Sequence, residues 1–216
     1  MFVQNYMTSK PITASVDISI LDAAEIMRVS KVRRLPLVDA QGILQGIVTD
    51  RDVRQATPSS ATTLDKHELS YLLGKLTAKS IMTRNVITIG GEATIEEAAL
   101  LMYKRRIGGL VIVDAENKVQ GIITETDIFK VFVDTMGLLE GKTRLTINAN
   151  DRIGVLGEIS NVFRDLSLNI TSIVTTPMKN GKKELVIRAD VVDKKELLVE
   201  KLREKGFEVT HITEIG

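Results

Sequence analysis

Two short stretches of the chain carry the same polar side chains at the same spacing. GIVTDRDV at residues 46–53 returns as GIITETDI at residues 121–128, and each copy places a threonine three residues before an aspartate, giving the pairs Thr49 with Asp52 and Thr124 with Asp127. A carboxylate in such a corner can accept two hydrogen bonds from a vicinal diol, and the threonine adds a third, which is the polar pattern of ribose recognition. The same spacing is also typical of a helix cap, in which these side chains satisfy free amides.

Phosphate groups on such a ribose would need cations, and only the first copy has them close to its motif. Its arginines are Arg33, Arg34 and Arg51. The equivalent positions of the second copy are uncharged, namely Gly108, Gly109 and Thr126, although two arginines at positions 105 and 106 lie one turn earlier. The two corners are therefore not equivalent. A solvated helix end that complements the helix dipole is the alternative interpretation of Arg33 and Arg34.

A repeat positions these corners. Residues 7–55 align without a gap with residues 82–130, a constant shift of 75 (82 − 7), and about a third of the positions are identical. A capping pair predicts the start of the first helix in each copy. The pairs are Ser19 with Asp22 and Thr94 with Glu97. An apolar stripe at helical spacing follows, formed by Ile20, Ala23, Ala24 and Met27 and by Ile95, Ala98, Ala99 and Met102. Each copy predicts strand, helix, strand, strand, helix, and we expect the two to pack together.

The rest of the chain predicts a linker and a third unit of different type. Leucine spacing between the repeats predicts a helix from Asp65 to Leu76. After Gly137 the pattern predicts strands at 144–148, 170–176, 184–191 and 207–213 and helices at 154–166 and 194–205. This βαββαβ order predicts a ferredoxin-like sandwich with both helices on one sheet face. The whole chain is expected to be α/β (α+β), with units at 1–55, 81–137 and 142–216 and a linker at 56–80.

Composition excludes several classes of function. Apolar residues make up 44% and charged residues 26%, and the formal charge of +1 gives no field that would gather nucleic acid or an anionic membrane. The absence of cysteine excludes disulfides and thiolate chemistry, and His67 and His211 lie too far apart to suggest a metal site. The start, MFVQNYMTSKP, does not resemble a signal peptide, and no apolar run approaches the ~18 residues of a membrane span, so we expect a cytoplasmic protein.

The repeated pattern, with MT, ITI, AA and LPLVD before LQGIVTDRD, resembles the CBS domain, and two tandem copies over about residues 1–135 resemble the CBS pair that forms one nucleotide-binding disc. The resemblance implies that threonine and aspartate hold ribose, that the first strand and the strand before the turn enclose adenine, and that basic residues meet phosphates. In the first copy it implies Ile12, Thr13, Arg33, Arg34, Pro36, Thr49, Arg51 and Asp52. In the second copy it implies Ile87, Thr88, Gly108, Gly109, Thr124 and Asp127.

The third unit, with INANDRIGVLGEISNVFRDLSLNI, resembles an ACT domain. Ile153 stands where that family often has proline, and Asp151 stands where amino-acid-binding members often present asparagine. Gly154 allows close approach of backbone to a ligand or partner, or simply reverses the chain. The ACT resemblance implies that this unit transmits a signal, dimerises or binds an amino acid as a second effector. The complete arrangement resembles acetoin-utilisation proteins of the AcuB type, which implies a link to acetoin metabolism.

Three classes of function are compatible with these features. The first is a regulatory sensor that binds AMP, ADP, ATP, S-adenosylmethionine or an NAD-type dinucleotide between the repeats and acts through different affinities for two arrangements. The second is an enzyme with Asp50 and Asp52 as paired carboxylates, but Asp50 is expected to point away, and no catalytic cofactor is indicated. The third is an assembly module without a nucleotide. A homodimer is expected for the first and third classes, because apolar sheet or helix surfaces commonly close in twofold dimers.

Overall fold

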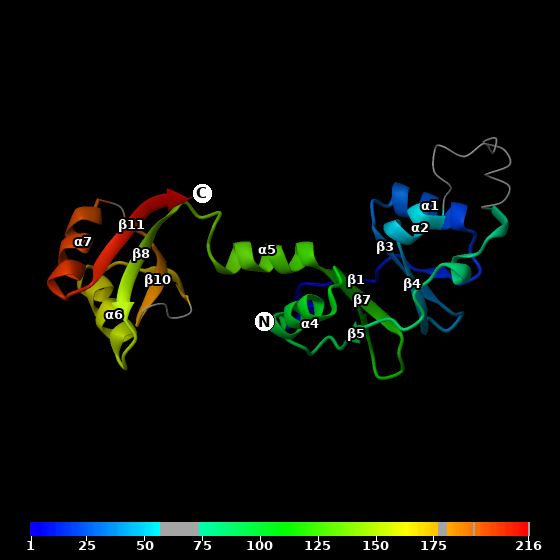
Figure 1. Ribbon diagram of the computed structural model, residues 1–216, viewed down its shortest axis with the longest axis horizontal. Coiled ribbons are helices and arrows are strands. Elements are labelled where there is room, and N and C mark those ends of the chain that lie inside the picture. The colour runs from blue at the N-terminus through cyan, green and yellow to red at the C-terminus, as the bar shows by residue number, and fades with distance from the viewer. Residues whose placement is uncertain (57–73, 177–180, 192, 216) are drawn as a thin grey trace. The chain divides into compact units, whose positions relative to one another are not determined.

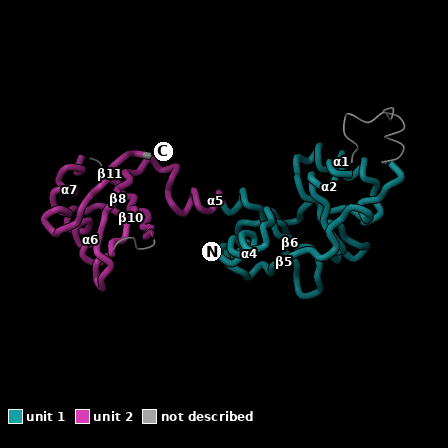
Figure 2. Tube along the Cα trace, in the orientation of Figure 1, with its two compact units in different colours: residues 1–128 teal, residues 129–216 magenta. Residues whose placement is uncertain are grey.

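The computed structural model describes residues 1–56, 74–176, 181–191 and 193–215. The chain divides into two compact units, residues 1–128 and 129–216 (Figure 2). The predicted helix from Asp65 to Leu76 lies mostly outside the described residues, as does His67. Within the described ranges, no helix combines the length and the apolar character that a membrane crossing needs.

The first repeat has the predicted order of elements (Figure 1). They are β2 (Ala14–Ser15), α1 (Ile20–Val29), β3 (Arg34–Val38), β4 (Leu44–Thr49) and α2 (Asp50–Ala56). Strand β2 runs parallel to β3, and β3 runs antiparallel to β4. The hydroxyl of Ser19 accepts a hydrogen bond from the amide of Asp22 at 3.0 Å, which confirms the predicted cap of α1. Of the predicted apolar stripe, Ile20, Ala23 and Met27 are buried and Ala24 is half-buried.

The second repeat follows the same plan. Its elements are β5 (Thr88–Ile89), α4 (Ile95–Arg105), β6 (Gly109–Val113), β7 (Val119–Thr124) and α5 (Glu125–Thr135). Thr94 and Glu97 form the predicted capping box at the start of α4, in which each side chain accepts a hydrogen bond from the other residue's backbone amide. Short 3-10 turns precede the two repeats, at Val3–Asn5 and Ala78–Ser80.

The repeats exchange their first segments. Strand β1 (Thr8–Ser9), from the first repeat, pairs antiparallel with β7 of the second, so the second sheet has the order β1-β7-β6-β5. In the opposite direction, Thr83 of the second repeat bridges to Ile47 of β4. The predicted packing of the two repeats is therefore built from reciprocal backbone pairing as well as from apolar contact.

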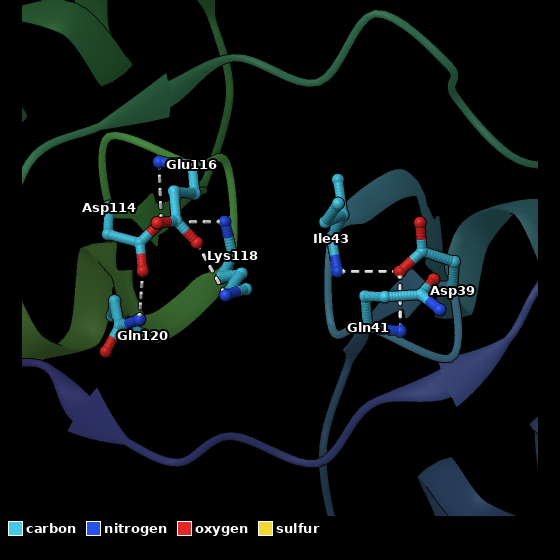
Figure 3. A network of polar contacts seen from close by, with 7 residues as sticks. All are labelled: Asp39, Gln41, Ile43, Asp114, Glu116, Lys118 and Gln120. Atoms are coloured by element: carbon cyan, nitrogen blue, oxygen red, sulfur yellow. Dashed lines mark hydrogen bonds and ion pairs between the residues drawn. The ribbon is translucent and has the colours of Figure 1, made fainter.

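The hairpin turn of each repeat is organised by one aspartate, whose carboxylate accepts hydrogen bonds from two backbone amides and one glutamine side chain. Figure 3 shows these contacts except the one from Gln45. The donors to Asp39 are Gln41, Ile43 and Gln45, at 3.0, 2.9 and 2.9 Å. The donors to Asp114 are Glu116, Lys118 and Gln120, at 2.9, 2.9 and 2.8 Å. The two turns also bond to each other, because the amide of Leu44 donates to the carbonyl of Asn117 at 3.0 Å. The aspartates thus shape the turns through which the repeats meet.

The second unit contains an antiparallel four-stranded sheet in the order β11-β8-β10-β9. Its elements are β8 (Lys142–Asn150), α6 (Val155–Asp165), β9 (Ile170–Thr175), β10 (Lys182–Ala189), α7 (Lys195–Glu204) and β11 (Glu208–Ile215). Both helices contribute to one core on one face of the sheet, in which Phe163 and Leu198 pack with Leu145 and Ile187. This arrangement confirms the ferredoxin-like prediction.

Candidate functional site

The first polar corner lies where β4 passes into α2. Thr49 is the last residue of β4, and Asp52 is in the first turn of α2. The Oδ2 atom of Asp52 accepts hydrogen bonds from the amide of Thr49 at 2.8 Å and from its hydroxyl at 2.7 Å, and the amide of Asp52 donates to Thr49 Oγ1 at 3.3 Å. Both side chains are half-buried. The motif therefore is a helix cap, as one of its two interpretations predicted.

The capping role does not use the whole carboxylate. Both of the hydrogen bonds that Asp52 accepts from Thr49 end on the same oxygen, Oδ2, and leave the second oxygen, Oδ1, outside the cap. An ionised carboxylate offers about four acceptor positions on its two oxygens. Capping and diol binding are therefore compatible, because one oxygen organises the corner and the other can serve a ligand.

The second polar corner repeats this geometry between β7 and α5. The Oδ2 atom of Asp127 accepts hydrogen bonds from the amide and from the hydroxyl of Thr124, both at 2.8 Å. Thr124 and Asp127 are both half-buried, as are Thr49 and Asp52. The two corners therefore match in the hydrogen bonds that the aspartate accepts from the threonine.

The predicted site residues of the first repeat gather at one end of its sheet. Arg34 lies opposite Thr49 in the register of β3 and β4, and the carbonyl of Arg33 accepts a hydrogen bond from the amide of Asp50 at 3.0 Å. The exposed Arg51 follows directly in the first turn of α2. Arg33 is also exposed. Three arginines and the polar corner thus share one edge.

The remaining predicted residues lie on neighbouring strands. Ile12 and Thr13 lead directly into β2, whose first residue pairs with Leu37 of β3. Because β2 and β3 are parallel, Ile12 and Thr13 approach the end of β3 where the corner lies. Pro36 is buried in β3, opposite Ile47. In the second repeat, Ile87 precedes β5, and Thr88 opens that strand opposite Val111.

Arg34 reaches from the first repeat to the second. Its guanidinium occupies the space that a side chain on Gly108 would need, and a Cβ on Gly109 would lie 3.0 Å from Arg34 Nε. The carboxylate of Glu125 borders the same space, since its Oε2 atom would lie 3.0 Å from the Gly108 Cβ. The two glycines therefore make room for a cation that the second repeat lacks. Comparison of the repeats position by position missed this contact, because the cation comes from the other repeat.

Two pockets lie mainly among residues of the second repeat. A pocket of about 450 Å³ beside its corner is lined by Met102, Tyr103, Lys104, Arg106 and Glu125. Arg106, the arginine that precedes the glycines, is thus in place to add positive charge here. A larger open pocket of about 750 Å³ includes Thr88 together with Gly90, Gly91 and Ile112.

The second unit has a pocket of about 200 Å³ at the loop between β8 and α6. Asp151 and Gly154 line it, and the carboxylate of Asp151 pairs with Lys183 at 2.9 Å. Gly154 adopts φ +88°, a left-handed conformation that a residue without a side chain adopts readily. Next to it, Arg152 makes two hydrogen bonds to Glu158 and holds the pKa of that carboxyl below its ordinary value.

Comparison with protein families divides the chain in the same way. The CBS domain matches residues 3–59 and again residues 78–134. The ACT domain matches residues 143–204. Among curated proteins, an L-aspartate semialdehyde sulfurtransferase of Methanocaldococcus jannaschii is 35% identical over 130 residues, which is 60% of this chain. The chain spans only 23% of that relative's length.

Three solved structures are similar to the first unit. The CBS domain pair of protein MJ0100, in complex with 5-methylthioadenosine and S-adenosyl-L-methionine, is 34% identical, with a TM-score of 0.52 and coverage of 62% of this chain and 97% of that one. A Vibrio cholerae protein named for acetoin utilization (AcuB) is 29% identical, with a TM-score of 0.54 and coverage of 65% and 96%. The protein CBSX2, in complex with AMP, is 26% identical, with a TM-score of 0.50 and coverage of 62% and 96%.

Proposed function

The chain belongs to the CBS domain family, as a tandem pair followed by an ACT domain, and from this membership we propose that it is a regulatory protein that binds an adenosyl ligand between its two CBS units. The observation that carries this proposal is that each polar corner uses one carboxylate oxygen to cap a helix and keeps the other outside the cap. One free oxygen is not specific to a binding site, because Glu97 caps α4 through a single oxygen in the same way. The corner of the first repeat is distinguished by Arg33, Arg34 and Arg51 at the same end of its sheet.

The similar structures support an adenosyl group as the common part of the ligand. One holds 5-methylthioadenosine and S-adenosyl-L-methionine, and another holds AMP. The proposed ligands of this chain are therefore AMP, ADP, ATP, S-adenosylmethionine or an NAD-type dinucleotide. Arg33 and Arg51, exposed beside the first corner, favour a ligand with a phosphate there. At the second corner the positive charge would come from Arg34 and from Arg106.

The residues predicted to hold the ribose and the adenine have proposed roles in this site. Asp52 and Asp127, with their threonines, would hold the ribose. The adenine would lie against the residues that lead into the first strands and against the buried proline of β3, namely Ile12, Thr13, Ile87, Thr88 and Pro36. The same proposal assigns residues 1–55 and 81–137 to the CBS units, 56–80 to their linker and 142–216 to the ACT domain.

For the ACT domain we propose dimerisation or the binding of a second effector such as an amino acid. The pocket at Asp151 and Gly154, of about 200 Å³, suits a molecule as small as an amino acid. The carboxylate of Asp151 is already paired with Lys183, so the amino group of a bound ligand would compete with that lysine. We propose further that the protein is a non-catalytic cytoplasmic homodimer, and that acetoin metabolism is the process it regulates.

Calorimetry tests the nucleotide proposal. AMP, ADP, ATP, S-adenosylmethionine and NADH are titrated into the full chain and into Asp52→Asn and Asp127→Asn, which keep the side-chain size and remove the charge. We expect at least one compound to bind, and one substitution to weaken it tenfold or more, because a charge-assisted hydrogen bond contributes about 1.5–3 kcal/mol. Binding at 100 times the dissociation constant should also add about 2.7 kcal/mol to the free energy of unfolding.

The competing function is an oligomerisation module without a nucleotide. The mutual hydrogen bonds of Thr49 and Asp52 favour it, since they give the corner a purely structural purpose. If no adenosyl compound binds and both asparagine variants are merely less stable, the corners are helix caps alone. The oligomeric state of the chain then carries the function.

A further inference from the structure

Two arginines face the same side of the ACT sheet, opposite its helices. Arg188 in β10 pairs in register with Arg144 in β8, whereas the neighbouring Ile187 pairs with Leu145 in the core. Successive residues of a strand point to opposite faces, so the two arginines share the face that the helices do not cover. Like charges placed directly opposite each other on a sheet are unfavourable.

Two of the three guanidinium nitrogens of Arg188 are buried without an acceptor. Only 6% of the residue is exposed, and the atoms Nε and Nη1 are buried with no hydrogen-bond partner among the described residues. Within the same part of the chain, no carboxylate lies within ion-pair distance of Arg188. Burial, together with the positive charge of Arg144, lowers the pKa of Arg188. A buried charge without a partner is among the most unfavourable features a fold can contain.

The surroundings of Arg188 are polar and partly closed. On the other side of β10, its register partner is Ser172, whose hydroxyl donates to the carbonyl of Met136 at 3.2 Å. The segment that follows α5 therefore contacts the edge strand β9. On the β8 side, Arg144 donates to Thr146 Oγ1 at 2.6 Å, and the hydroxyl hydrogen of Thr146 is left to donate elsewhere. Among the described residues, none of these neighbours supplies an acceptor to Nε or Nη1 of Arg188.

We propose that Arg188 and Arg144 bind a small oxyanion with two negative charges, a dicarboxylate or a phosphate group, on the face of the ACT sheet that lies away from its helices. A guanidinium presents paired N–H donors that match a carboxylate or a phosphate oxygen pair. Two guanidiniums side by side balance two negative charges, and Thr146 adds a hydroxyl donor. Because so little of Arg188 is exposed, the group that reaches it must be narrow. This site lies on the face away from the core, whereas the loop pocket at Gly154 lies at the start of α6.

Calorimetry on the full chain tests the site with two probes, inorganic phosphate and malonate, at a constant ionic strength maintained with chloride. We expect one anion per chain to bind, Arg188→Met to abolish binding, and Arg144→Gln to weaken it at least tenfold. Arg188→Met should fold, because replacing an unpaired buried charge by an apolar side chain of similar length is neutral or stabilising. Arg164→Met is the matched control: Arg164 is exposed and pairs with Asp165 on a helix.

Thermal unfolding separates the proposal from a structural role. Without added anion, Arg188→Met should unfold at the same temperature as the wild type or higher, and phosphate should raise the midpoint of the wild type alone. The proposal is overturned if neither probe binds, or if both bind Arg188→Met as tightly as Arg164→Met. If neither binds and Arg188→Met changes the oligomeric state, the acceptor is a carboxylate of a second copy and not a free anion. Adenosyl binding, measured on the same samples, is independent of each outcome.

Discussion

The guanidinium of Arg34 fills the space that a side chain on Gly108 would need, so a residue of the first CBS repeat limits the size of the side chain at that position of the second CBS repeat. The contact joins the two polar corners physically, because Arg34 lies opposite Thr49 in one sheet while Glu125 of the other corner borders the same space. A ligand that draws Arg34 toward one corner removes it from the other. The two proposed sites are therefore expected to be coupled.

The first prediction concerns this contact. Gly109→Ala should lower the free energy of unfolding by about 1–3 kcal/mol, because the added methyl meets both Arg34 and the backbone. Gly108→Ala should cost less, about 1 kcal/mol, because the atoms that its methyl meets are the ends of two flexible side chains, Arg34 and Glu125. Arg34→Ala should relieve most of the loss at Gly108. It should relieve less at Gly109, where the carbonyl oxygen of Ile123 would still lie 3.1 Å from the new Cβ. Denaturant unfolding of the single and double variants measures both couplings, and strictly additive effects would show that the side chains do not meet.

Much of the fold follows from patterns along the chain, and the ACT unit shows why. Its strands and helices end within two residues of the predicted bounds, since apolar periodicity, turn residues and the change of period at Gly137 are all local signals. The helix starts at Ser19 and Thr94 are equally local, because a cap involves residues three positions apart. The pairing of Thr49 with Asp52 was predictable for the same reason.

The contacts between the repeats depend on information that the pattern does not contain. Met82 and Gly46 are each matched by an identical residue in the other repeat, so the signal was present as an identity. The reason for the identity is visible only in the structure, where the repeats exchange segments. The Met82 Sδ atom lies 2.5 Å from the position that a Gly46 Cβ would take, so a side chain at position 46 would require Met82 to move. Asp39 and Asp114 are also identical, but their role depends on the turn conformation that brings amides to one carboxylate (Figure 3).

The second prediction compares two glycines at the start of α6. Gly154 has φ +88° and open space where a Cβ would lie, so Gly154→Ala should lower the free energy of unfolding by about 1–3 kcal/mol through backbone strain alone. Gly157 lies inside the helix, also with open space and without a positive φ, so Gly157→Ala should raise it by about 0.5–1 kcal/mol. Thermal and denaturant unfolding measure both changes. Effects of the same sign would contradict the assigned conformations.

The third prediction concerns acid stability. The pKa of Asp114 lies below its ordinary value of 3.8, chiefly because the carboxylate accepts the amide of Lys118 and further because of Glu116, Gln120 and the Lys118 charge. Since the folded pKa is below the unfolded one, the stabilisation is complete above the ordinary value and is lost as the pH falls through the folded pKa. The difference in unfolding midpoint between wild type and Asp114→Asn should therefore be constant above about pH 5 and shrink below about pH 4. A difference that does not depend on pH would contradict this origin.

The fourth prediction separates the phosphate part of the proposed ligand from its nucleoside part. Arg33 and Arg51 are exposed, so each contact with a phosphate is screened and should be worth about 1 kcal/mol or less. Arg33→Gln and Arg51→Gln should therefore each weaken the binding of AMP by about two- to fivefold. Each should leave the affinity for 5-methylthioadenosine, which has no phosphate, within about twofold of the wild-type value. AMP binding should also weaken with added salt more steeply than binding of the uncharged compound.

Arg54→Gln is the control for this comparison, because Arg54 lies on the same helix and already pairs with Asp50 at 2.9 Å. It should change neither ligand. If Arg33→Gln and Arg51→Gln weaken AMP and 5-methylthioadenosine equally, the arginines act on the shape of the corner and not on a phosphate. If they affect neither compound while Asp52→Asn affects both, the ribose site stands, and neither Arg33 nor Arg51 contacts the ligand.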